Sequence, residues 1–257
     1  MIAVLSPAKT LDFTGALPTG TIPTLPRLSD ESAELARGAS KLSKRKLGEL
    51  MHISDKLAAL NADRYARFEE QETRPALYAF AGDVYTGFEA RTLESPAIAY
   101  AQDHVRILSG LYGLLRPLDS IRPYRLEMGT RWAPGRARTL YDWWGGRIAD
   151  LLADDVADEG SGTVLNLASQ EYWRAVAGKL PASVRVIEVE FLEPGPTGPR
   201  FVSFHAKKAR GMMARWMCEH HIGDVDAMRG FDSAGYCFDA GESGADRWRF
   251  VRTADPD

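Results

Sequence analysis

The chain has 257 residues, of which 45% are hydrophobic and 26% charged, with a formal net charge of −3 at pH 7. This composition is typical of a soluble globular protein that is long enough to bury a sizeable core. The overall charge excludes a protein that coats nucleic acid through a global basic field, so any polyanion binding must come from a local patch.

Cysteine usage and hydropathy indicate a cytoplasmic protein. Cys218 and Cys237 have neither CxxC nor disulfide-framework spacing, which suits a reducing compartment. The first residues include no basic segment, and no apolar run approaches the roughly 18 residues of a membrane span. We therefore expect no signal peptide and no membrane partner, and we favour a monomer.

The first third of the chain predicts one strand followed by helices. Residues 2–5 form a short apolar run typical of a buried strand. Helices are then predicted over residues 29–41 and over residues 44–51 with Ser43 as the N-cap, and Ser54 is predicted to cap a third helix.

The middle of the chain predicts a strand over residues 77–80 and a helix over residues 103–114. Residues 115–132 contain too many Pro and Gly for one regular element, which indicates an ordered loop of the kind that often carries function. A strongly amphipathic helix is predicted over residues 139–156.

The last part predicts an apolar strand over residues 164–167 and a helix over residues 207–221. Two strands flank a Pro/Gly-rich turn, and a hairpin closes the chain; these ranges are 184–191, 200–205, 236–239 and 248–251. No composition break marks a linker. The pattern favours an α/β fold in a single domain spanning residues 1–257.

A candidate anion site follows the first strand in Ser6-Pro7-Ala8-Lys9-Thr10. Ser6 could cap a helical turn that begins at Pro7, leaving free backbone N–H groups beside the Lys9 ammonium. A plain structural cap is the alternative. Ser-x-x-Lys also occurs in acyl-transfer enzymes, but their partner motifs are not found here, so a nucleophilic Ser6 is the least favoured interpretation.

Two further segments concentrate positive charge. In the loop, Arg116 and Arg125 either contact an anionic ligand or brace the loop through Asp119 and Glu127. On the helix over residues 207–221, a spacing of 100° per residue gathers the cations on one face with small residues between them; this face holds Lys207, Lys208, Arg210, Arg215, Gly211 and Ala214. Such a face favours a polyanion or an anionic ligand, with an ordinary solvated face as the alternative.

Weaker signals complete the candidate site. Lys56 lies where two short helices resemble a helix-hairpin-helix, although the hairpin lacks the usual glycines and a plain helix pair is favoured. Asn166 and Ser169 follow a buried strand, and polar residues in that position commonly line a ligand crevice. If the protein is an enzyme, the groups available for polar chemistry are Ser6, Asp83, Tyr124, Glu127, Asn166 and Ser169.

Metal and cofactor sites are not expected. Cys218 and His221 are three residues apart on a predicted helix, but no second pair has metal-site spacing. No Walker A or GxGxxG phosphate loop is present.

Motifs along almost the whole chain resemble those of the YaaA family. The segments that carry the resemblance are 6–12, 53–58, 82–87, 108–113, 116–119, 123–129, 166–169 and 207–211. The resemblance implies a single α/β domain of unusual topology, with a central mixed sheet flanked by helices and a positively charged cleft. It also implies a role in surviving hydrogen peroxide, by limiting free iron and oxidative DNA damage, and DNA binding through a helix-hairpin-helix-like element.

Two hypotheses follow. In the first, the protein is a stress protein that binds the DNA backbone without reading bases, through Lys9, Lys56, Arg116, Arg125, Lys207, Lys208, Arg210 and Arg215. In the second, the same cations hold a nucleotide, nucleobase or other anionic small molecule on which an enzyme acts. A deep pocket would favour the second hypothesis, and a groove wide enough for a duplex the first.

Overall fold

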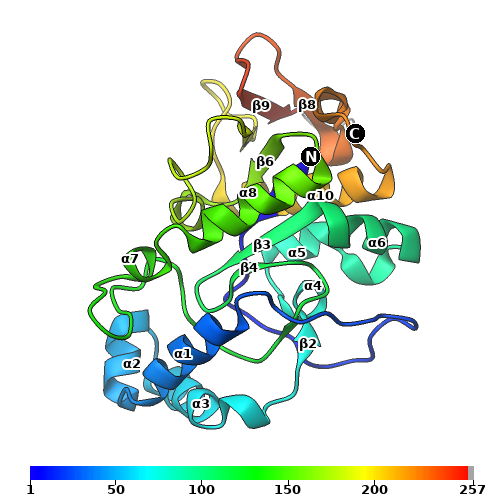
Figure 1. The fold of residues 1–257 in the computed structure, drawn as a ribbon. Helices are drawn as coiled ribbons and strands as arrows, with labels where there is room; N and C mark the ends of the chain where they lie inside the picture. The colour runs from blue at the N-terminus through cyan, green and yellow to red at the C-terminus, as the bar shows by residue number, and fades with distance from the viewer. Residues whose placement is uncertain (254–257) are drawn as a thin grey trace.

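A seven-stranded mixed sheet forms the centre of the computed structural model, which describes residues 1–253 (Figure 1). Its strands are β1 (Ile2–Leu5), β3 (Val105–Ser109), β4 (Gly113–Leu115), β6 (Thr163–Leu167), β7 (Arg185–Leu192), β8 (Tyr236–Phe238) and β9 (Arg247–Arg252). They lie in the order β4-β3-β1-β6-β7-β9-β8. The five inner strands run parallel, and the edge strands β4 and β8 are antiparallel to their neighbours. The predicted α/β class with a central mixed sheet is confirmed.

Helices cover both faces of this sheet, as buried parallel strands require. Every residue of β1 is buried. The helix α8 (Arg147–Glu159) contacts β1 and β4 on one face, in front of the sheet in Figure 1. The helix α10 (Ser203–Glu219) contacts β7 and packs against α5 (Asp83–Phe88) and α6 (Ser95–His104).

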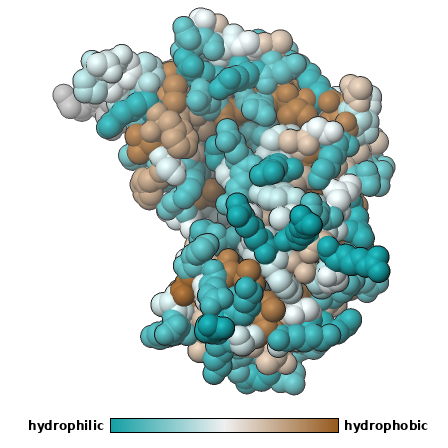
Figure 2. Space-filling model, turned by 90° about the vertical axis from the view of Figure 1, so that its left-hand side faces the viewer, coloured by the Kyte–Doolittle hydropathy of each residue, from teal (hydrophilic) through white to brown (hydrophobic). Residues whose placement is uncertain are grey.

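Three helices form the lower body of the molecule in Figure 1: α1 (Ser29–Ser40), α2 (Lys44–Met51) and α3 (Asp55–Ala66). Ser43 and Ser54 cap α2 and α3, because their hydroxyls accept hydrogen bonds from the N–H groups of Lys46 and Leu57. These predicted helices and caps are confirmed. In space-filling view, the outline narrows between the lower body and the rest of the molecule (Figure 2).

Two predictions in the middle of the chain are wrong. Residues 77–79 lie in a short helix, α4 (Ala76–Ala79), instead of a strand, and Phe80 forms only an isolated bridge with Leu11. The helix predicted over residues 103–114 is the end of α6 followed by β3 and β4. A strand that is buried on both faces also hides every apolar side chain, so the helical spacing of Val105, Leu108 and Leu111 could not separate the two structures.

Glycines break the helix predicted over residues 139–156. Gly145 has φ of 54° and ends α7 (Leu140–Trp144), and α8 begins after Gly146. A positive φ strains residues with a Cβ atom but not glycine. The amphipathic pattern continues across the break because both helices pack on the same core.

The C-terminal prediction is correct except in one segment. β7 and the closing β8–β9 hairpin are confirmed, but residues 200–205 do not form a strand. Only Arg200 pairs with Glu193, and α10 already begins at Ser203. The other elements are α9 (Gln170–Trp173), four 3₁₀ turns (Phe68–Glu70, Ala90–Thr92, Val225–Gly230 and Ser233–Gly235), and a small sheet of β2 (Arg74–Pro75) with β5 (Ser120–Ile121). None of the helices within residues 1–253 is long and apolar enough to cross a membrane.

Candidate functional site

A cleft of about 860 Å³ opens beyond the carboxyl ends of β1 and β6. β1 lies between β3 and β6, so the chain runs from it in both directions across the sheet. Open α/β sheets bind ligands at this kind of switch point. The lining comes from the loop after β1, the end of β6 and the loop after it, the start of α5, α9, the middle of β7, the first half of α10 and the start of β9. It includes Ser6, Lys9, Asp83, Asn166, Ser169, Glu171, Tyr172, Glu188, Glu190, Phe201, Ser203, Lys207, Arg210 and Arg247.

One face of α10 forms a wall of this cleft. Ser203, Lys207 and Arg210 are spaced by four and three residues, which places them on one side of the helix, and all three line the cleft. Lys207 is half exposed, and its Nζ lies 3.7 Å from Asp83 Oδ2 at the start of α5. Two of the four cations predicted on this helix therefore reach the cleft.

Arg210 is a partly buried cation that has no counter-charge in the described part of the chain. Its Nε is shielded from solvent and has no hydrogen-bond partner, and no ion pair to its guanidinium is formed within residues 1–253. Burial lowers the pKa of Arg210, although an arginine side chain remains protonated in proteins. A buried charge without a partner costs free energy, which an anion in the cleft would offset.

Lys9 and Arg125 share one carboxylate beside the cleft. Lys9 Nζ lies 2.6 Å from Glu127 Oε2, and Arg125 Nη2 lies 3.2 Å from Glu127 Oε1. The predicted bracing pair Arg125–Glu127 is present. Lys9 keeps 60% of its side chain exposed and lines the cleft, so it can exchange Glu127 for a ligand at modest cost.

Ser6 links the ends of β1 and β6. Its Oγ accepts a hydrogen bond of 2.8 Å from the Ser169 N–H and lies 3.3 Å from Ser169 Oγ. Asn166 Oδ1 accepts a bond of 3.0 Å from the Ala168 N–H and turns the chain at the same edge. The predicted helical turn after Ser6 is wrong, because residues 7–10 are not helical. The Ser6 hydroxyl holds the ends of two strands together instead, and the Lys9 ammonium is held by Glu127.

Two buried tyrosines, Tyr85 and Tyr124, form hydrogen bonds beneath the residues that line the cleft. The Tyr85 hydroxyl donates to the Ser6 carbonyl over 3.0 Å, and Tyr124 is bonded to Ser109 at 2.7 Å. Burial raises the pKa of both Tyr85 and Tyr124 above the ordinary value, so both stay protonated at neutral pH. Tyr124 therefore supports the fold beneath the site and does not line the cleft.

Five of the predicted cations do not line the cleft: Lys56, Arg116, Arg125, Lys208 and Arg215. Arg116 is paired with the fully buried Asp119, which is the predicted loop brace. Arg215 is bound to Glu219 at 2.7 Å and to the carbonyls of residues 88 and 89. Lys56 is on α3, in the lower body of Figure 1 and far from α10.

The small residues of α10 serve helix packing. A Cβ atom at Gly211 would lie 1.8 Å from the Val84 carbonyl oxygen of α5, and one at Gly87 would lie 2.1 Å from the Lys208 carbonyl oxygen. Gly211 and Ala214 are buried. Gly211 and Ala214 were predicted to lie between the cations on a face that favours a polyanion or an anionic ligand, but α5 occupies the space beside Gly211.

Sequence reasoning missed part of the lining: Glu188, Glu190, Phe201, Ser203 and Arg247. Glu188 and Glu190 lie on either side of Val189 in β7, so both glutamates point to the same face of the strand. Two acidic residues in a strand of a sheet that helices cover could have indicated that this face meets a polar cleft. Phe201 and Ser203 were hidden by the wrong strand prediction over residues 200–205.

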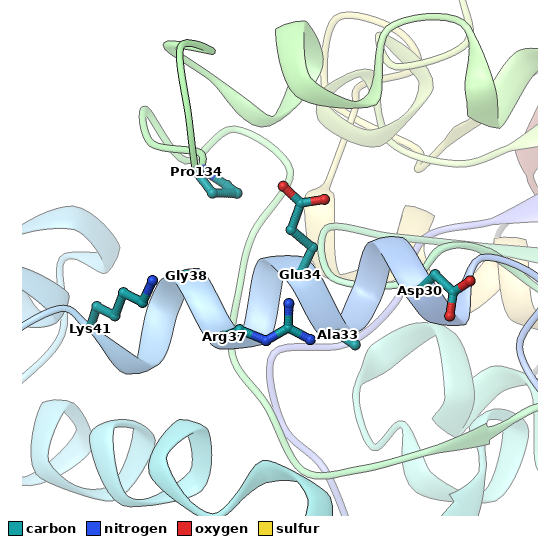
Figure 3. A pocket seen from close by; sticks show the side chains of 7 residues that line it. All are labelled: Asp30, Ala33, Glu34, Arg37, Gly38, Lys41 and Pro134. Carbon is teal, nitrogen blue, oxygen red and sulfur yellow. The ribbon is translucent and has the colours of Figure 1, made fainter.

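A second hollow, of about 510 Å³, lies along α1 beside Pro134 (Figure 3). Its charged residues Asp30, Glu34, Arg37 and Lys41 are all exposed and of both signs. Because these charged groups are solvated and none of the lining residues has a buried polar atom without a hydrogen-bond partner, the hollow shows no sign of a ligand site. Within residues 1–253 no three His, Cys, Asp or Glu side chains are grouped to hold a metal ion.

Comparison with known proteins gives one consistent result. The family described as "Peroxide stress protein YaaA" matches residues 1–242. A UPF0246 protein of Rhizorhabdus wittichii is 61% identical over 253 residues, which cover 98% of this chain and 100% of the relative. UPF0246 proteins of Paracidovorax citrulli and Neisseria gonorrhoeae are 48% and 45% identical, each covering 98% of both chains.

Proposed function

The chain belongs to the YaaA peroxide stress protein family, and we propose that it serves the oxidative-stress response by binding a small anionic ligand in the cleft at the ends of β1 and β6. Arg210 carries this proposal. A partly buried guanidinium that pairs with no carboxylate of residues 1–253 and lines an 860 Å³ cleft is arranged to receive an anion from solution.

The charges and volume of the cleft favour a small molecule over a duplex. Its volume falls within the range of ligand pockets, roughly 300 to 1,000 Å³. Four carboxylates, Asp83, Glu171, Glu188 and Glu190, line it together with Lys9, Lys207, Arg210 and Arg247. A groove for duplex DNA needs a run of cations along the phosphates, and here equal numbers of acids oppose them.

A thermal-shift screen tests the proposal. Inorganic phosphate, ribose 5-phosphate and nucleoside monophosphates should include ligands that raise the melting temperature of the wild type, because they bind the native state. Arg210→Met should weaken their affinity about tenfold or more through the loss of a charge-assisted bond. Lys208→Met is the matched control, since Lys208 is on the same helix but does not line the cleft. No stabilisation of the wild type, or equal losses in both variants, would contradict the proposal.

DNA binding is a second candidate function, carried by the α2–α3 hairpin. Lys44 and Lys56 are exposed there, neither forms an ion pair within residues 1–253, and Ser54 caps α3 at the turn. Non-specific binding at this surface would shield DNA from iron-driven oxidation.

A charge-reversal experiment separates the two candidates. Lys44→Glu/Lys56→Glu should abolish duplex binding that falls steeply with salt, and leave small-anion binding unchanged. If Arg210→Met removes duplex binding as well, DNA enters the cleft and the assignment of the hairpin is wrong.

A further inference from the structure

Phe201 exposes a large aromatic surface inside the cleft. Its side chain is 57% exposed and lines the cleft beside the start of α10. Phe204 is 55% exposed only three residues later, but it does not line the cleft. Aromatic rings left in water next to a ligand site offer a face on which a flat ring can stack.

The wall of the cleft therefore changes from apolar to positively charged along the chain. Phe201 provides an apolar surface, and Lys207 and Arg210 follow it on the cleft side of α10. A ligand that uses both features must combine a flat aromatic part with an anionic part. Sugar phosphates and inorganic anions use only the cations, and nucleosides use only the ring.

Carboxylates elsewhere in the cleft limit the charge of that ligand. Glu188 is exposed and forms no ion pair within residues 1–253, whereas Glu190 lies 3.5 Å from Arg249. Such groups repel a highly charged polyphosphate, and they accept hydrogen bonds from amino groups of a base. This favours a single phosphate group over a triphosphate.

We infer that the ligand is a nucleoside 5′-monophosphate, with its phosphate on Arg210 and Lys207 and its base stacked on Phe201. This inference rests on the proposed function, because it uses the same cleft and the same cation. It adds the chemical class of the ligand and the residue that distinguishes a nucleotide from any other small anion.

A ligand series measured by calorimetry tests the inference. AMP should bind about tenfold more tightly than ribose 5-phosphate, since stacking of one base contributes about 1 to 3 kcal/mol. ATP should bind no more tightly than AMP. Adenosine, which lacks the phosphate, should bind more weakly than AMP by about tenfold or more.

Two phenylalanine variants make the test specific. Phe201→Ala should reduce AMP affinity to the level of ribose 5-phosphate and leave ribose 5-phosphate binding unchanged. Phe204→Ala removes an equally exposed ring outside the cleft, so it should change neither affinity. Because both side chains are more than half exposed, neither variant is expected to unfold the protein, and circular dichroism checks this.

The outcomes separate this inference from the proposed function. Equal affinities for AMP and ribose 5-phosphate, both sensitive to Arg210→Met, would overturn the nucleotide inference and leave the anion site standing. Equal losses of AMP binding in Phe201→Ala and Phe204→Ala would also overturn it. If no member of the series binds the wild type, both the inference and the proposed function fail.

Discussion

An arginine lies on each side of the sheet, Arg106 buried and Arg210 partly buried, and the fold neutralises the charge of only the first. On the α8 face, Arg106 of β3 donates from Nε to Asp155 over 2.6 Å and from Nη1 to the carbonyls of residues 102 and 105. Arg27 reaches the same carboxylate from the other side. On the α10 face, Arg210 has no such partner within residues 1–253 and lines the cleft.

The contacts of these two arginines distinguish a structural cation from a ligand-binding one. A buried arginine with a carboxylate and two carbonyls has its charge and its donors satisfied by the fold. A partly buried arginine without a carboxylate or carbonyl partner keeps the desolvation cost of its charge, and a bound anion would offset that free energy. Burial alone therefore does not identify a functional residue, whereas burial together with missing partners does.

Among variants of the two arginines and their surroundings, we expect the largest loss in the free energy of unfolding for Arg106→Met. The variant leaves Asp155 with Arg27 as its cation and removes the donors to two carbonyls, and each buried group left unsatisfied costs about 1 to 3 kcal/mol. Urea denaturation followed by tryptophan fluorescence measures this loss in the free energy of unfolding. A loss under about 1 kcal/mol would show that Arg106 is no more structural than Arg210.

A second prediction concerns the packing face of α10. Gly211→Ala gains about 1 kcal/mol in helix propensity, but its Cβ atom would lie 1.8 Å from the Val84 carbonyl oxygen. Overpacking against backbone costs about 3 kcal/mol, so we expect a net loss of about 2 kcal/mol. Gly223→Ala is the control, because nothing lies within 4 Å of the added atom. Equal stability of both variants in urea would mean that α5 does not approach α10 this closely.

The third prediction is a smaller effect that appears only in acid. Burial raises the pKa of Asp155, but hydrogen bonds from Arg27 and Arg106 outweigh it and hold that pKa below its ordinary value of 3.8. A lowered pKa in the folded state contributes stability above pH 3.8 and loses it as the pH falls through the folded pKa. The wild type should therefore lose stability below about pH 4 more steeply than Asp155→Asn, in urea titrations from pH 6 to pH 2.5. Parallel curves would contradict this role of the carboxylate.

The sequence predicted the sheet edge of the site better than its helical wall. Short apolar runs that end in small polar residues correctly placed Ser6 and Ser169 after buried strands. The parallel pairing of β1 and β6 then brings the two serines together. Caps such as Ser43 and Ser54 were readable since they depend on neighbouring residues only.

The faces of α10 could not be assigned from the sequence. The 100° spacing places Gly211 among the cations, and nothing in the local pattern says that Val84 and Gly87 of α5 meet it there. Whether a cation has a partner is equally non-local, since Glu127 is far from Lys9 in the chain and Asp155 is far from Arg106. Long-range contacts of this kind decide which of the predicted cations are free.

The smallest effect on stability is expected for Arg210→Met, and this variant is the direct counterpart of Arg106→Met. Both replace an arginine by an apolar chain of similar length, but at position 210 no carboxylate within residues 1–253 loses its counter-charge. We expect the free energy of unfolding to change by less than about 1 kcal/mol. Any change should be an increase, because an apolar side chain does not carry the desolvation cost of a partly buried charge. The same urea titration measures it in phosphate-free buffer. If Arg210→Met instead loses about 3 kcal/mol or more, its guanidinium holds the fold together as Arg106 does, and a missing partner no longer identifies the ligand-binding arginine.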